Sequence, residues 1–195
     1  MKINEIFYSL QGEGFWTGTP CVFVRFSGCN LSCPFCDTQH KTGQTYTNDE
    51  LFNEIKKYPS KHIVFTGGEP SLQLSSTLCQ MLKQEGYYIQ VETNGTKALP
   101  SSVDWITCSP KTDYCNNAKV CHAHVNELKV VFNNENTYRL QEYLIQIHAD
   151  NYYLQPCDVG NVELNNKILS SCVDYILKNP NWRLSLQTHK IINVR

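Results

Sequence analysis

Two hydrophobic patterns alternate along the chain. One is a short run of β-branched and aromatic residues, such as CVFVRFS at 21–27 and HIVFT at 62–66, which is typical of a buried strand. The other is an apolar stripe in which residues recur every three or four positions, which is typical of an amphipathic helix. The first pattern predicts strands at residues 21–27, 62–66, 87–92, 105–109, 127–132, 152–156 and 183–187.

The helical pattern occurs four times, each time between two predicted strands. Thr47 and Glu50 form a capping box that opens the first helix, and Gly86 is placed to end the second. The four apolar faces consist of Leu51, Phe52 and Ile55; of Leu74, Leu78, Met81 and Leu82; of Leu140, Tyr143, Leu144 and Ile147; and of Leu164, Ile168, Leu169, Cys172, Val173, Ile176 and Leu177.

Strands that alternate with helices form parallel βαβ units. A complete eight-unit barrel needs at least about 200 residues and typically about 250. The chain has 195 residues, and residues 1–20 precede the first predicted strand. We therefore predict one α/β domain over residues 1–195, an open partial (βα)6 barrel with an N-terminal extension.

The composition indicates where the chain is located and which classes of partner it does not bind. The formal net charge is −1, so no electrostatic footprint favours nucleic acid or an anionic membrane. No run of eighteen apolar residues could span a bilayer, and the N-terminus MKINEIFYSLQGEG lacks the apolar core of an export signal. We expect a cytoplasmic protein with neither nucleic-acid nor membrane partners, whose ten cysteines are thiols or metal thiolates rather than disulfides.

The chemically distinctive residues come directly after predicted strands. In parallel α/β folds, the loops that follow the carboxyl ends of the strands converge on one ligand site. We therefore expect these loops to share one face of the molecule. They are the cysteine loop after residue 27, Gly67-Gly68-Glu69-Pro70, Thr93-Asn94-Gly95, Pro110-Lys111 and Gln155-Pro156.

Three cysteines share the first of these loops, Cys29, Cys33 and Cys36, in the spacing C-x3-C-x2-C. A cubic 4Fe–4S cluster has four irons, so three thiolates leave one iron open for an exogenous ligand. A structural zinc ion is the alternative, although zinc knuckles usually carry C-x2-C pairs and a zinc ion needs a fourth ligand. The candidates for that fourth ligand are His40, Cys115, Cys121, His122 and His124.

With an aromatic residue before the last cysteine, here Phe35, the loop resembles the signature of radical S-adenosylmethionine (SAM) enzymes. Within that superfamily the chain resembles the 7-carboxy-7-deazaguanine synthase family almost from end to end. The stretches that carry the resemblance are SLQGEG (9–14), VRFSGCNLSCPFCDT (24–38), TGGEP (66–70), ETNGT (92–96), SPK (109–111), LQP (154–156) and RLSLQTHK (183–190).

The resemblance implies a radical reaction on a small molecule. A reduced cluster cleaves S-adenosylmethionine to a 5′-deoxyadenosyl radical, which takes hydrogen from carbon 6 of 6-carboxy-5,6,7,8-tetrahydropterin. Ring contraction with loss of ammonia then gives 7-carboxy-7-deazaguanine, a precursor of queuosine and related nucleosides. The resemblance also implies a one-electron donor of the flavodoxin or ferredoxin type, a Mg²⁺ ion beside the substrate, and a homodimer.

The same resemblance assigns the cofactor residues. Cys29, Cys33 and Cys36 hold the cluster. Gly67 and Gly68 allow close backbone approach to the methionine part of S-adenosylmethionine. The full set implied for S-adenosylmethionine is Phe35, Gly67, Gly68, Glu69, Asn94, Ser109, Pro110, Lys111, Gln155 and Pro156.

On the substrate side, the resemblance implies Arg25, whose forked guanidinium suits bidentate capture of a carboxylate. Thr38 is the implied Mg²⁺ ligand, a hydroxyl that acts together with substrate oxygens and waters. Arg195 ends the sequence, and its main-chain carboxylate is implied to reach the substrate. The implied substrate residues are Leu10, Gln11, Gly12, Arg25, Thr66, His189 and Arg195.

Two other functions stay open as alternatives. A glycyl-radical activase has the same cysteine triplet but acts on a protein backbone, and Asp37-Thr38 and the 183–190 stretch disfavour it. A non-enzymatic electron carrier or zinc-binding module is the second alternative. Cys115, Cys121, His122 and His124 could form an auxiliary metal site, which the resemblance does not imply. The remaining cysteines, expected in the core, are Cys21, Cys79, Cys108, Cys157 and Cys172.

Overall fold

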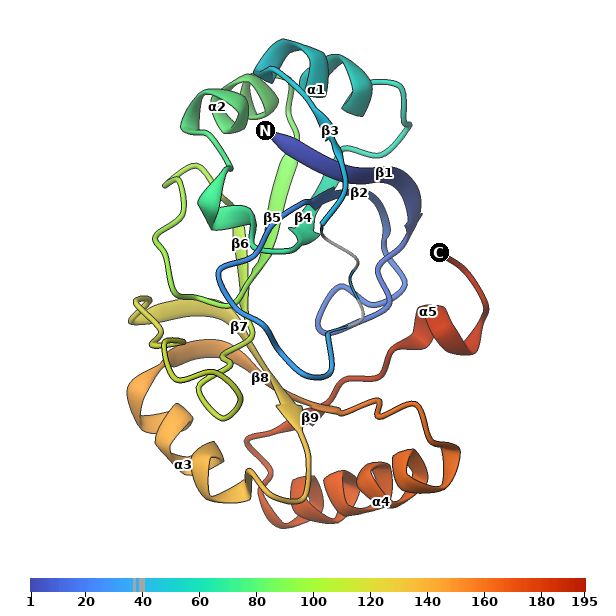
Figure 1. Ribbon diagram of the computed structural model, residues 1–195, viewed down its shortest axis with the longest axis vertical. Helices are drawn as coiled ribbons and strands as arrows, with labels where there is room; N and C mark the ends of the chain where they lie inside the picture. The colour runs from blue at the N-terminus through green and yellow to red at the C-terminus, as the bar shows by residue number, and fades with distance from the viewer. Residues whose placement is uncertain (37, 39–40) are drawn as a thin grey trace.

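The computed structural model describes residues 1–36, 38 and 41–195, and its strands form a nine-stranded sheet (Figure 1). The strand order is β3-β1-β2-β4-β5-β6-β7-β8-β9. Neighbouring strands from β2 to β9 are parallel, whereas β1 is antiparallel to both β2 and β3. The strands are β1 (Lys2–Leu10), β2 (Pro20–Phe26), β3 (Gln44–Thr45), β4 (His62–Gly67), β5 (Tyr88–Thr93), β6 (Trp105–Cys108), β7 (His124–Phe132), β8 (His148–Pro156) and β9 (Arg183–Leu184).

The four predicted helices form where their apolar stripes lie. The capping box is confirmed, because the Thr47 hydroxyl oxygen accepts from the Glu50 amide at 3.2 Å and the Glu50 carboxylate accepts from the Thr47 amide at 2.8 Å. Gly86 follows the second helix with a φ of 75°, the left-handed conformation that ends helices. The helices are α1 (Asn48–Ile55), η1 (Pro70–Leu72, a 3₁₀ turn), α2 (Ser76–Gln84), α3 (Thr137–Gln146), α4 (Val162–Lys178) and α5 (Thr188–Ile191).

The parallel sheet of a partial barrel is confirmed, and the N-terminal extension proves to be part of it. Strand β1 pairs along β2 and buries Ile3 and Phe7. A shift in the pairing between Ile3 and Glu5 interrupts the two-residue alternation of β1. The strand pattern of this segment is therefore weak, which is why the sequence alone did not predict it.

Several predictions at the ends of elements are wrong. The strands predicted to begin at residues 127 and 152 begin earlier, at His124 (β7) and His148 (β8). Leu74 precedes α2, because Ser75 caps that helix by accepting from the Leu78 amide at 3.1 Å. The last strand covers only Arg183–Leu184 instead of residues 183–187. The buried face of α4 is narrower than its stripe, since Leu177 at the end of the helix is 77% exposed.

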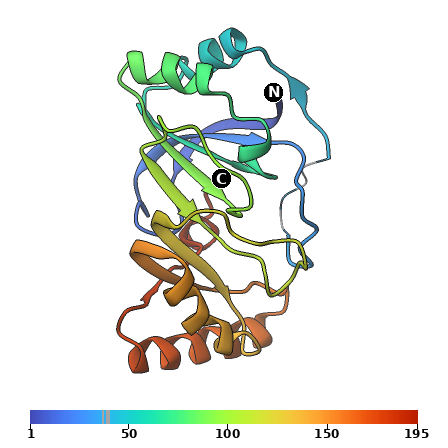
Figure 2. The same cartoon turned by 90° about the vertical axis from the view of Figure 1, so that its left-hand side faces the viewer.

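The helices form two groups, and each group covers its own hydrophobic core. Helices α1 and α2 lie at one end of the molecule, and α3 and α4 lie at the other (Figures 1 and 2). Between the groups, residues 94–104 and 109–123 connect β5 to β6 and β6 to β7 as fully described segments without helix. None of the described helices is long and apolar enough to cross a membrane. The middle strands of the sheet, β5, β6 and β7, are thus connected by these two loops and not by helices.

Candidate active site

A cavity of about 740 Å³ lies at the carboxyl ends of the parallel strands. Its walls come from the β1–β2 loop, from the loops after β2, β4, β5, β6 and β8, and from the C-terminal segment. Pro110 is the one predicted site residue that does not line it. The predicted residues that do line it are Leu10, Gln11, Gly12, Arg25, Cys29, Cys33, Phe35, Cys36, Thr38, Thr66, Gly67, Gly68, Glu69, Asn94, Ser109, Lys111, Gln155, Pro156, His189 and Arg195.

One end of the cavity, here named the thiol end, carries Cys29, Cys33 and Cys36. Cys29 and Cys33 are half-buried and Cys36 is exposed. Burial raises the pKa of the Cys29 thiol and raises that of Cys33 to about 12, so both thiols are protonated near neutral pH and a bound metal must displace their protons. The predicted ligand His40 and the motif residue Asp37 lie outside the described residues.

The donor set at the thiol end suits a cluster better than a single ion. Among the residues the structure describes, no three Cys, His, Asp or Glu side chains converge on one metal position. A zinc ion requires its ligands around a single centre, with Zn–S distances of about 2.3 Å. A cube places each thiolate on a different iron, so it fits three thiols that share a loop and face one cavity without meeting at a point.

Two glycines bring the loop after β4 against the cysteine loop. Gly67 has a φ of 107°, which is strained for other residues. A Cβ atom on Gly68 would lie 1.9 Å from the carbonyl oxygen of Gly28. The Glu69 amide donates to that same carbonyl at 2.9 Å. The two glycines therefore let the loop after β4 pack against the cysteine loop, and their approach to S-adenosylmethionine stays a prediction.

Glu69 is 1% exposed and is held by groups of the chain. Its carboxylate accepts from the Thr93 hydroxyl at 2.6 Å, from the Asn94 amide at 2.8 Å and from the Ser71 amide at 3.0 Å. The Asn94 side chain in turn donates to Asn30 in the cysteine loop at 3.0 Å. The loops after β2, β4 and β5 are therefore fixed to one another, and the role of Glu69 toward an ammonium group stays a prediction.

Lys111 brings a cation to the wall near Cys33. Its ammonium group donates to the Ser109 carbonyl at 2.7 Å and also to the Ser109 hydroxyl. Burial lowers the pKa of Lys111, and the nearby thiols Cys33 and Cys108 oppose this shift. A lysine in this position can balance anionic groups that enter the cavity.

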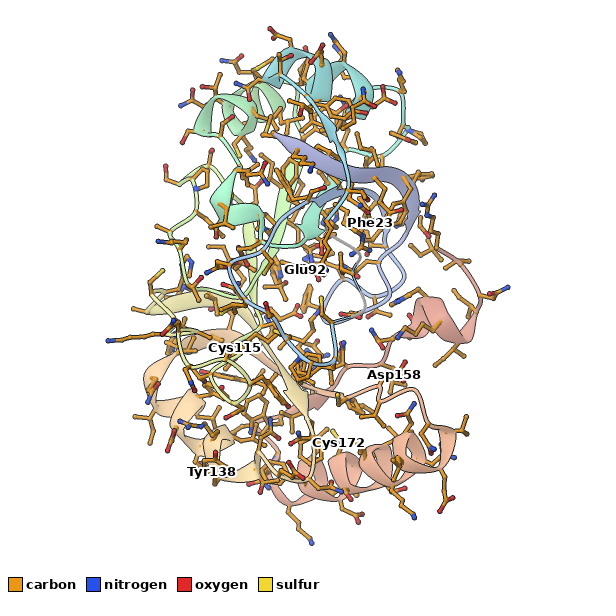
Figure 3. All side chains as sticks on the ribbon, viewed as in Figure 1. Phe23, Glu92, Cys115, Tyr138, Asp158 and Cys172 are labelled. Atoms are coloured by element: carbon orange, nitrogen blue, oxygen red, sulfur yellow. The ribbon has the colours of Figure 1, made fainter. Side chains whose placement is uncertain are left out.

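The other end, here named the charged end, was not predicted from the sequence. Lys129 is buried on β7 and donates to Glu13 at 2.5 Å, with Glu92 at 3.5 Å. Glu92 appears near the centre of the molecule in Figure 3. Gln11 donates to Glu92 at 3.0 Å, and Gln187 donates to Glu13 at 2.9 Å. In the charged end, the lysine is therefore paired with two carboxylates, and each carboxylate also accepts a hydrogen bond from a glutamine amide.

The pKa values of this network follow from burial and pairing. Burial raises the pKa of Glu13, but the charge of Lys129 and the hydrogen bonds from Lys129 and Gln187 outweigh it and lower the pKa to about 2. Burial lowers the pKa of Lys129, and the surrounding carboxylates reverse this and hold it above its usual range. Glu13 and Lys129 are thus both charged at neutral pH, and their ion pair persists across the physiological range.

Glu127 lies behind this network, two residues before Lys129 on the same face of β7. It is 1% exposed, and burial raises its pKa to about 7 against the opposing charge of Lys129. The Phe15 amide donates to its carboxylate at 3.0 Å. Gly14 has a φ of 64°, and a Cβ there would lie 2.0 Å from the same carboxylate. Glu127 and Lys129 are charges in an otherwise apolar strand, ELKVVF, and that signal could have revealed the charged end.

Arg25 on β2 also lines the cavity. Its Nε donates to Glu5 at 2.8 Å, and its Nη1 donates to the Thr38 hydroxyl at 3.1 Å. The Arg195 guanidinium contacts the same Glu5 carboxylate. The side chain of Arg195 is thus at the cavity, beside a predicted substrate residue.

The C-terminal segment closes on the β1–β2 loop. The Thr188 amide and hydroxyl both donate to the Gly12 carbonyl at 2.9 Å. A Cβ on Gly12 would lie 2.0 Å from Nδ1 of His189. Because Gly12 has no side chain, the His189 ring can lie against it and line the cavity.

The four residues considered for an auxiliary metal site do not meet. His122 contacts the Lys97 carbonyl at 2.9 Å, and His124 contacts Asp150 at 3.1 Å. The Cys115 sulfur instead lies 4.0 Å from that of Cys33. The five cysteines expected in the core, Cys21, Cys79, Cys108, Cys157 and Cys172, are all buried, which confirms that prediction.

Three comparisons show to which known proteins the chain is similar. A profile of the Radical SAM superfamily matches residues 23–123. The 7-carboxy-7-deazaguanine synthase of Bacteroides thetaiotaomicron is 49% identical over 194 residues, which span 100% of this chain and 98% of that protein. The one of Haemophilus influenzae is 40% identical over 197 residues, which span 99% and 93%. The crystal structure of QueE from Escherichia coli gives a TM-score of 0.78 at 28% identity and covers 95% of this chain and 92% of that one.

Proposed function

We propose the function of this chain from one premise: it belongs to the 7-carboxy-7-deazaguanine synthase family of the radical SAM superfamily. On that premise it is a lyase that converts 6-carboxy-5,6,7,8-tetrahydropterin to 7-carboxy-7-deazaguanine with loss of ammonia. The observation that carries the proposal is the full-length similarity to the Bacteroides enzyme, together with a cavity that is lined by the motif residues of this chain.

Cys29, Cys33 and Cys36 would hold the 4Fe–4S cluster. When bound, the cluster supplies the electron that cleaves S-adenosylmethionine at the iron left without a protein ligand. The fit rests on three thiols that face one cavity and do not converge on one ion.

The loops after β4, β5 and β6 would bind S-adenosylmethionine. Gly67 and Gly68 line the cavity and, because neither has a side chain, their backbone packs closely against β2 and the cysteine loop. Lys111 offers a cation, and the buried Glu69 keeps the Asn94 loop in place. These groups would orient the cofactor, and the enclosed wall would exclude water from the reactive intermediate.

Arg25 is our proposed partner for the carboxylate of the pterin. A guanidinium can bind a carboxylate with two parallel hydrogen bonds, and Arg25 already pairs with one carboxylate, that of Glu5, through a single Nε contact. Substrate binding would then exchange Glu5 for the substrate carboxylate. Gln11, Thr66 and His189 add hydrogen-bonding groups to the same cavity.

We also propose the Mg²⁺ ion at Thr38. The Thr38 hydroxyl lines the cavity, and the Glu5 carboxylate is linked to it through Arg25. Mg²⁺ prefers oxygen ligands and keeps several waters, so one hydroxyl and substrate oxygens are a suitable set. Removal of Mg²⁺ with a chelator and its return should lower and restore turnover with the cluster content unchanged.

The proposed partners are a flavodoxin- or ferredoxin-type electron donor and a second copy of the chain. Large apolar side chains on α4 and α5, among them Val162 (78% exposed) and Ile191 (69% exposed), support association because a dimer would cover them. Light scattering would measure the dimer. We also propose a cytoplasmic location, where a reducing environment suits free thiols, and a product used in queuosine or related 7-deazapurine synthesis.

One anaerobic experiment tests the function. The chain is reconstituted with iron and sulfide, then given a reductant, S-adenosylmethionine and the carboxytetrahydropterin, and both products are measured by mass spectrometry. We expect 5′-deoxyadenosine and 7-carboxy-7-deazaguanine. Cofactor cleavage without pterin turnover, together with a stable complex with a large enzyme, would favour the glycyl-radical activase. Zinc without iron or sulfide would favour a non-enzymatic module.

A further inference from the structure

The loop between β6 and β7 places a fourth cysteine against the thiol end. The sulfur atoms of Cys115 and Cys33 are 4.0 Å apart, although 82 residues separate them in sequence. Cys115 appears in Figure 3 on this loop. Among the described cysteines, this is the one thiol–thiol contact within that distance. The contact therefore arises from the fold and not from the spacing of the motif.

Packing keeps the two loops in this arrangement. The Tyr114 ring packs edge-on against the Phe35 ring, with 4.6 Å between the ring centroids. The Cys115 amide donates to the Lys111 carbonyl at 2.9 Å, and the Cys121 amide donates to the Gly95 carbonyl at 2.9 Å. The loop that carries Cys115 is thus anchored on both sides of that residue.

Cys115 approaches Cys33 from outside the cavity. Cys33 lines the cavity and Cys115 does not. Because Cys115 is not among the residues that line the cavity, we do not assign it as a further ligand of the cluster. The position of Cys115 instead suits a direct bond to the Cys33 sulfur.

We propose that Cys115 is a redox modification site: in the cluster-free chain it forms a disulfide with Cys33 and so blocks loading of the cluster. The inhibition of loading rests on the proposed function, whereas the disulfide itself does not. Both cysteines are half-buried, within reach of a small oxidant, and both lie outside helix and strand. A disulfide has an S–S distance of about 2.05 Å, so the sulfurs must approach by roughly 2 Å, a shift that two loop residues can make.

The reaction needs a two-electron oxidant, and we name hydrogen peroxide. Peroxide converts one thiol to a sulfenic acid with release of one water. The second thiol attacks that sulfur, the S–S bond forms, and a second water leaves with the remaining proton. Two thiols and one peroxide thus give one disulfide and two waters, and a dithiol reductant reverses the change.

The first test maps the disulfide. Reduced, cluster-free chain is treated with hydrogen peroxide, free thiols are alkylated, and the chain is digested with trypsin without reductant. We expect tryptic peptide 112–119, which contains Cys115, to be joined to peptide 26–41, and fragmentation to assign the bond to Cys33. Cys115→Ser should lose the joined peptide. The matched variant Cys121→Ser, an exposed cysteine of the same loop, should keep it.

The second test measures cluster loading. A cluster-loaded donor protein is offered to peroxide-treated chain without small thiols or sulfide, and the iron content is measured after separation. We expect loss of loading in the unmodified chain, recovery after dithiothreitol, and retained loading in Cys115→Ser. A bond from Cys33 to Cys29 or Cys36 in place of Cys115 would overturn the proposal, as would equal loss of loading in Cys115→Ser. Failure of the reduced chain to load would count against the proposed function alone, since the peptide map still decides the disulfide.

Discussion

The two ends of the cavity differ in whether their side chains already have partners within the chain. At the charged end, Lys129, Glu13 and Glu92 satisfy one another, with Gln11 and Gln187 in support. At the thiol end, Cys29, Cys33 and Cys36 face the cavity without converging on a common point, and burial keeps Cys29 and Cys33 protonated. The charged end therefore owes its geometry to the chain, whereas the thiol end acquires its final geometry from the group that binds there.

The largest effect should come from the thiol end. Cys33→Ala removes one of the three thiolates, so the cluster is lost and 5′-deoxyadenosine formation should fall to background. Stability of the cluster-free chain should change little, because Cys33 contributes little to the core. Iron content and product are measured after anaerobic reconstitution, with Cys121→Ser as the control. A Cys33→Ala chain with full iron content and activity would show that the thiol end is not the cluster site.

The charged end should show the opposite behaviour. Lys129→Met leaves the half-buried carboxylates of Glu13 and Glu92 without their buried cation, which should cost about 3 kcal/mol of the free energy of unfolding. Urea unfolding measures the loss. Lys167→Met is the control, because its exposed pair with Glu163 contributes at most about 1 kcal/mol. If the Lys129→Met chain were as stable as the control, the ion pairs of Lys129 would not stabilise the charged end.

Arg25 is assigned to the substrate and not to the cluster. Its replacement should therefore affect turnover of the pterin more than cleavage of S-adenosylmethionine. Arg25→Ala removes a charge-assisted contact of about 2–3 kcal/mol, which corresponds to roughly a 30- to 150-fold lower kcat/KM for the pterin. Cleavage of S-adenosylmethionine without substrate turnover should persist, because the thiol end is untouched. Arg183→Ala on β9 is the control. Equal loss of both activities in Arg25→Ala would contradict the role assigned to Arg25.

The smallest effect concerns pH. The pKa of Glu127 is raised from 4.5 to about 7, so its contribution to stability is complete below about pH 4.5 and is lost as the pH rises through 7. Glu127→Gln cannot ionise, so between pH 5 and 8 it should lose about 2 kcal/mol less stability than the unmodified chain. Urea unfolding at several pH values measures this difference. Glu163→Gln, an exposed glutamate, is the control, and identical pH profiles for all three chains would refute the shift.

Sequence reasoning succeeded where the signal is local. Strands β2, β4 and β7 are apolar runs, and the capping box of α1 lies within four residues, so both were predictable. The cysteine loop and the motifs after the strands were predictable because parallel strands bring their carboxyl ends together. Strand β1 escaped notice because a bulge breaks its alternation.

The charged end was not predictable by the same means. Glu13 and Lys129 are 116 residues apart, and their pairing depends on a loop that reaches across the sheet. No spacing rule connects them. The contact between Cys33 and Cys115 is non-local in the same sense, since it exists only once the β6–β7 loop packs on the cysteine loop.

The contact of Thr188 with Gly12 has a consequence for the order in which the site is completed. A ribosome makes the β1–β2 loop early, but the wall that meets it begins at Thr188, which lies 176 residues after Gly12. A nascent chain that has exposed all three cysteines still lacks His189 and its neighbours. The cavity is therefore finished only after translation has passed α5.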